Sequence, residues 1–98
     1  MSRRLIIRPE AEAETGEAFE WYEDCNPGLG DEFLLCLDAA FNSILRSPDQ
    51  YPRIHRAVRR ALLRRFPYEV FFVADEKQIV VISVFHAKRN PKWWQERI

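Results

Sequence analysis

The chain has 98 residues, of which 47% are hydrophobic and 31% charged. This length and composition predict one domain, residues 1–98, and exclude a disordered, collagen-like or low-complexity chain. The net charge is zero, but residues 1–50 carry 4 basic and 11 acidic residues, a net of −7, and residues 51–98 carry 11 and 4, a net of +7. This asymmetry favours an anionic partner for the Arg-rich second half, or two charged faces that are solvated or lie against each other.

Two cysteines without a Cys-x-x-Cys motif, and two histidines, predict neither a disulfide framework nor a zinc site. The chain has no glycine-rich phosphate loop, so we expect no cofactor and no metal. Its start lacks the apolar stretch of a signal peptide, and no unbroken apolar run exceeds five residues. We therefore expect a cytoplasmic protein without a membrane span.

The first half of the chain predicts a short strand and two helices. Residues 3–8 form the strand, and 9–24 form an amphipathic helix with Pro9 in its first turn. Residues 29–46 are the clearest helix, because their apolar side chains recur at steps of three and four. Ser47-Pro48 ends it, since the residue before a proline avoids the α region. The two helices predict an antiparallel hairpin.

The second half changes to strand patterns after a loop at 49–56. We expect strands at 57–66, 68–74 and 79–85, the last two almost wholly apolar and therefore central in the sheet. A short helical turn follows in the tail, residues 90–98. The predicted fold is α+β with the order β-α-α-β-β-β: a two-layer domain in which an antiparallel sheet packs against the N-terminal helical hairpin.

Cations dominate the candidate functional residues. On a strand through 57–66, alternation would send Arg60 and Arg64 to one face and Arg59 and Arg65 to the other. One face would then present a pair of guanidinium groups to an acidic partner or a phosphate, or simply to solvent.

Four further residues have both a functional and a structural interpretation. His86, at a strand end before Lys88 and Arg89, is a candidate general acid or base, or a residue bonded to backbone. Trp93 and Trp94 could form a binding hot spot or a base-stacking platform, or seal the sheet. Glu69 interrupts an apolar strand and is expected to pair with an arginine, with a catalytic carboxylate as the alternative.

Residues 60–72 and 81–94, with the segments Arg65-Phe66-Pro67-Tyr68 and His86-Ala87-Lys88-Arg89-Asn90-Pro91, resemble the RelE/ParE superfamily of bacterial toxins from type II toxin–antitoxin systems. The resemblance covers essentially the whole chain and implies the fold order derived above. It also implies a role in plasmid stabilisation and a small cognate antitoxin that wraps and neutralises the toxin.

The superfamily has two activities of different classes. RelE-like members cut mRNA in the ribosome, whereas ParE-like members poison DNA gyrase by binding it. Glu69 stands where the nucleases usually carry an arginine, and a carboxylate there would repel the scissile phosphate. The chain also has no tyrosine after Tyr68, where the nucleases tend to place a catalytic one. The resemblance therefore favours the ParE-like branch.

We accordingly expect a toxin that binds DNA gyrase and is not itself an enzyme. The alternatives are a ribosome-dependent mRNA endonuclease, or a toxin fold that retains only antitoxin binding. The residues expected to bind partners are Arg59, Arg60, Arg64, Arg65, Lys88, Arg89, Trp93 and Trp94. If the protein is a nuclease, the catalytic set is His86, Arg64, Arg65 and Arg89.

Overall fold

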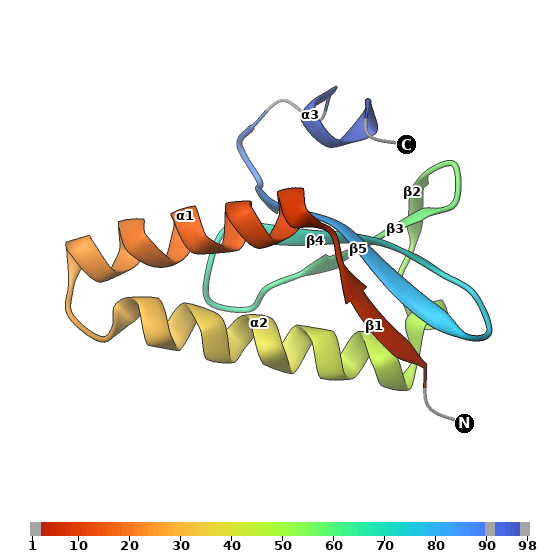
Figure 1. Ribbon diagram of the computed structural model, residues 1–98, viewed down its shortest axis with the longest axis horizontal. Helices are drawn as coiled ribbons and strands as arrows, with labels where there is room; N and C mark the ends of the chain where they lie inside the picture. Colours follow the sequence, from red (N-terminus) through yellow and green to blue (C-terminus); the bar gives the residue numbers. More distant parts are fainter. Residues whose placement is uncertain (1–2, 90–91, 97–98) are drawn as a thin grey trace.

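The computed structural model describes residues 3–89 and 92–96, except for the side chains of Trp93 and Trp94 (Figure 1). In chain order the elements are β1 Arg4–Ile7, α1 Pro9–Cys25, α2 Leu29–Arg46, the 3-10 turn η1 Pro48–Gln50, β2 Arg53–His55, β3 Val58–Leu62, β4 Tyr68–Ala74, β5 Gln78–His86 and α3 Lys92–Gln95. The predicted helical hairpin is confirmed, with α1 and α2 side by side in Figure 1.

A tight connection between α1 and α2 holds the hairpin together. Gly28 has φ +92°, a left-handed conformation that favours glycine. The Glu23 carboxylate accepts hydrogen bonds from the N–H groups of Gly28 and Gly30, both at 3.0 Å. A side chain from the end of α1 thus caps the N-terminus of α2, where backbone N–H groups otherwise lack partners.

The sheet has five strands in the order β1-β5-β4-β3-β2. Strands β3, β4 and β5 form the expected antiparallel meander, with β4 and β5 central. The sheet as a whole is mixed, because β1 pairs with β5 in parallel. The expected antiparallel sheet is confirmed for β2 to β5. The parallel pairing of β1 was not predicted, since strand periodicity carries no information about the direction of pairing.

The second difference is β2, which lies in the stretch expected to be a loop. Its three residues pair with β3 in antiparallel fashion across an irregular register. This edge strand is defined by its backbone hydrogen bonds to β3. It was not predicted, because three residues are too few to show side-chain alternation. The order is therefore β-α-α-β-β-β-β with α3 at the end.

Strand β3 is shorter than predicted, and this changes the positions of two arginines. It ends at Leu62, and the chain then turns through residues 63–67 into β4. Two backbone hydrogen bonds close this turn, from Leu63 N–H to Tyr68 O and from Tyr68 N–H to Phe66 O. Pro67 cannot donate to a ladder. Arg64 and Arg65 therefore lie in a turn, and the expected set of four arginines on one strand was wrong.

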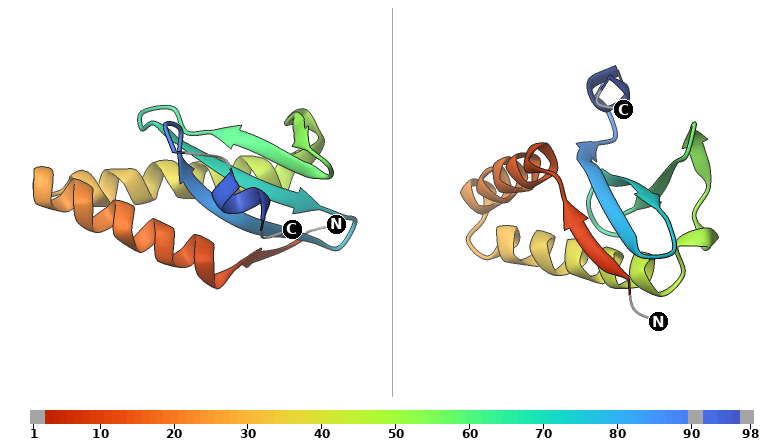
Figure 2. Two further views of the ribbon diagram at one scale, coloured as in Figure 1. Left: turned by 90° about the horizontal axis from the view of Figure 1, so that it is seen from above. Right: turned by 45° about the vertical axis from the view of Figure 1, so that its right-hand side comes forward.

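Apolar side chains are buried on both faces of the sheet, as the apolar strands predicted. The larger cluster lies on the hairpin side and includes Phe33, Ile44, Val70 and Phe72. The smaller cluster, on the opposite face, consists of Val58, Phe71, Ile82 and Phe85. Helix α3 follows the end of β5 and stands apart from the hairpin (Figure 2). Across residues 3–89 and 92–96, no helix is long and apolar enough to cross a bilayer.

Candidate partner-binding surface

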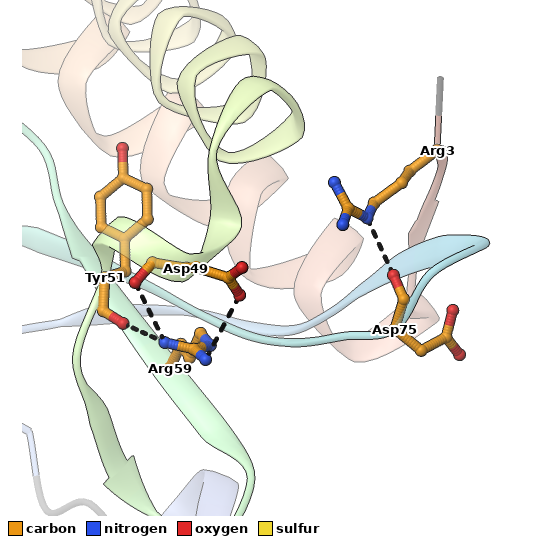
Figure 3. Close-up of polar contacts among 5 residues, drawn as sticks. All are labelled: Arg3, Asp49, Tyr51, Arg59 and Asp75. Atoms are coloured by element: carbon orange, nitrogen blue, oxygen red, sulfur yellow. Dashed lines mark hydrogen bonds and ion pairs between the residues drawn. The ribbon is translucent and has the colours of Figure 1, made fainter. Parts of the chain in front are cut away.

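Arg59 is engaged within the protein (Figure 3). It lies on the hairpin side of β3, where its register partner is Phe72. Its guanidinium donates a hydrogen bond to the carbonyl oxygen of Tyr51 and lies 3.5 Å from the carboxylate of Asp49. Only 16% of its side chain is exposed. These contacts fasten η1 to the sheet, so Arg59 is poorly placed to reach a partner.

Arg60 projects from the opposite face of β3 and pairs with Glu69 of β4 at 3.4 Å. The Glu69 side chain is only 12% exposed, against 40% for Arg60. The expectation that Glu69 pairs with an arginine is confirmed. A nearly buried carboxylate needs this compensation, because desolvation penalises its charge.

Arg64 and Arg65 are both exposed and serve different neighbours. Arg65 lies 3.4 Å from Glu32 of α2, with its guanidinium 5.8 Å from the ring centre of Phe66. Arg64 lines a groove of about 440 Å³ between α2 and the end of β3, the α2–β3 groove, together with Arg46, Tyr51 and Leu62. Of the two arginines in this turn, Arg64 is the one that lines the α2–β3 groove.

His86 ends β5 and is tied to the backbone. Its Nδ1 accepts a hydrogen bond from the Lys88 N–H at 3.1 Å, and the Arg89 N–H donates to its carbonyl oxygen at 3.0 Å. The imidazole also stands edge-on to the Tyr68 ring, with centroids 5.1 Å apart. His86 is therefore bonded to backbone, which is the structural one of its two predicted interpretations.

His86 also borders a hollow of about 400 Å³ between α1 and the end of β5, which we call the α1–β5 hollow. Arg89 lies on the same hollow, whereas Arg64 and Arg65 do not line it. The predicted nuclease set is thus divided between separate parts of the surface. The remaining lining residues are Glu14, Glu17, Ala18, Trp21, Tyr22, Tyr68 and Val84.

Two tyrosines that line this hollow have raised pKa values. Burial raises the pKa of Tyr22, assisted by Tyr68 and Cys25. Burial also raises the pKa of Tyr68, where Glu17 and Glu14 add to the effect and Arg89 opposes it. Both phenols therefore stay protonated at neutral pH and can donate hydrogen bonds.

Glu14 lines the hollow and also accepts hydrogen bonds from the edge of the sheet. β1 pairs with β5 only from Gln78 to Val81, so α1 covers the next part of that edge. There Glu14 Oε1 accepts hydrogen bonds from the Ser83 hydroxyl at 2.9 Å and the Val84 N–H at 3.2 Å. Ser83 is fully buried, so the carboxylate satisfies a polar group that water cannot reach.

The tail contributes Lys88 and Arg89, both exposed at the end of β5. The backbone of Trp93 and Trp94 belongs to α3, but their side chains lie outside the described part of the structure. Their predicted role in binding therefore stays a prediction. Within the described ranges, no group of three or more His, Cys, Asp and Glu side chains is placed to hold a metal ion.

The α1 side of the hollow was not among the sites predicted from the sequence. Glu14, Glu17 and Trp21 are spaced by three and four residues, which places them on one face of a helix. That spacing was readable beforehand. What could not be read was that this face borders the end of β5, because this contact joins distant parts of the chain.

Both the fold and the sequence of this chain match those of known proteins. A chain from the chromosomal ParDE TA system of P. aeruginosa superposes with a TM-score of 0.77 at 17% identity, covering 88% of this chain and 97% of its own. The model of the family described as "ParE toxin of type II toxin-antitoxin system, parDE" matches residues 5–91.

Two curated relatives agree with this result. Toxin ParE2 from two strains of Mycobacterium tuberculosis is 30% identical over 92 residues, covering 93% of this chain and 88% of the relative. The chain therefore belongs to the ParE toxin family of type II toxin–antitoxin systems, the branch that the resemblance favoured.

Proposed function

We propose that this toxin arrests growth by binding DNA gyrase in the cytoplasm, and that a cognate antitoxin neutralises it as part of a plasmid-stabilising pair. Membership in the ParE family supports both partners, since ParE-like toxins act on gyrase by binding. A binding poison needs a complementary surface rather than a set of proton carriers. The exposed cations Arg64, Lys88 and Arg89 can supply part of that surface.

The observation that carries this proposal is the environment of His86. RNA cleavage needs a base, an acid and cations around the scissile phosphate. The hollow beside His86 contains Arg89, but also the carboxylates of Glu14 and Glu17. Two negative charges oppose a phosphate and its more negative transition state, and Arg64 and Arg65 do not line this hollow to offset them.

Induced expression in a bacterium, with and without the gene beside the toxin gene, tests the proposal. Wild-type protein should arrest growth, and the neighbouring product should restore it. His86→Ala should still arrest growth, because binding needs no proton transfer from the imidazole. Thermal unfolding of the purified variant checks that the fold is retained.

Two other outcomes would support the alternatives. Loss of toxicity in folded His86→Ala, together with mRNA cleavage on translating ribosomes by the wild type, would favour the endonuclease. Normal growth with the wild type, but capture of the neighbouring product, would favour a toxin fold that retains only antitoxin binding.

A further inference from the structure

Helix α1 has a strongly one-sided charge. Between Pro9 and Cys25 the chain has seven acidic residues and no basic one. The helix therefore presents a negative surface that is complementary to a basic partner.

The α1–β5 hollow is where this charge meets exposed aromatic surface. Trp21 is 63% exposed, which is high for so large an apolar side chain. Its ring stands edge-on to Tyr22, with centroids 5.2 Å apart, and Tyr68 forms the sheet side of the same hollow. One turn before Trp21, Glu17 is exposed on the same helix face.

These groups match the chemistry of a cationic side chain. Aromatic faces attract a guanidinium or ammonium group, most strongly when a tryptophan is present, and a carboxylate can pair with it. Arg89 at the hollow carries the opposite charge, but Glu14 and Glu17 outnumber it. The apolar stem of lysine or arginine can lie along Trp21 while its charged end reaches Glu17.

We infer that the α1–β5 hollow takes a lysine or arginine side chain of the antitoxin. The inference rests on the proposed neutralisation by that antitoxin, which is the partner that the family itself implies. It assigns a basic anchor to the antitoxin, in addition to the acidic side chains expected opposite the toxin's arginines. Exposed tryptophan beside charge is typical of residues that dominate binding energy.

The test measures the affinity of purified toxin variants for the antitoxin encoded beside the toxin gene, by calorimetry at low and moderate salt. Glu17→Lys reverses the charge at the hollow, and Trp21→Ala removes its aromatic wall. Glu20→Lys is the matched control, because Glu20 is exposed on the same helix but does not line the hollow. Thermal unfolding verifies that all variants are folded.

We expect Glu17→Lys and Trp21→Ala each to weaken binding at least tenfold, and Glu20→Lys to change it less than twofold. A Lys→Glu or Arg→Glu change at one antitoxin position should restore binding to Glu17→Lys. Equal weakening by Glu17→Lys and Glu20→Lys would overturn the inference, because it would reflect only the overall charge of α1. Unchanged binding by the hollow variants would overturn it while leaving the antitoxin partnership intact, whereas no binding by the wild type would contradict both.

Discussion

At the scale of single residues, charge pairing decides which arginines are available to a partner. Arg59 and Arg60 neighbour each other in sequence, yet they lie on opposite faces of the sheet and both have partners within the protein. Arg64 and Arg65 are exposed in the following turn, where Arg65 forms a surface pair with Glu32. The sequence identified these cations and predicted an arginine partner for Glu69. It did not show where β3 ends, because backbone hydrogen bonds among Leu63, Phe66 and Tyr68 set that limit.

The Arg60–Glu69 pair predicts a stability difference. Arg60→Ala should lower the free energy of unfolding by about 1–3 kcal/mol, because it leaves a nearly buried carboxylate without compensation. Arg65→Ala is the control: its pair with Glu32 is 59% and 47% exposed, and such surface pairs contribute about 0–1 kcal/mol. Urea denaturation of both variants measures the difference, and equal losses would show that Glu69 does not depend on Arg60.

At the scale of elements, both helices were predictable to within a residue, because their apolar spacing and proline boundaries are local signals. The edges of the sheet were not. The short strand β2 and the parallel pairing of β1 depend on which strands meet after collapse, and three or four residues contain too little pattern to specify that.

Two glycines in the hairpin predict opposite effects of one substitution. Gly16 lies within α1, where an added Cβ would have nothing within 4 Å, so Gly16→Ala should stabilise the protein by about 0.5–1 kcal/mol. Gly30 lies at the helix contact, where an added Cβ would come within 2.8 Å of the Phe19 backbone oxygen. Gly30→Ala should therefore destabilise the hairpin.

Thermal unfolding of the two glycine variants measures this contrast directly. The midpoint should rise for Gly16→Ala and fall for Gly30→Ala. A rise in both would mean that α1 and α2 do not approach as closely at Gly30 as the structure places them.

At the scale of the whole molecule, the fold brings the C-terminal end of β5 against α1 and divides the cations between separate hollows. The candidate nuclease residues are scattered by this arrangement, while His86 and Arg89 are brought beside acidic and aromatic side chains. The sequence shows which residues are charged or aromatic, but it could not show which of them lie together. The contacts that bring α1 to β5 join residues about 70 positions apart, such as Glu14 and Val84.

The central claim is that this protein acts by binding DNA gyrase, and an assay with purified components tests it most directly. Wild-type and His86→Ala protein should both inhibit supercoiling of relaxed plasmid by gyrase, or trap cleaved DNA, and the antitoxin should relieve the effect. Normal supercoiling at a large molar excess of folded toxin would contradict the claim, as would inhibition that disappears with His86→Ala while its fold is unchanged.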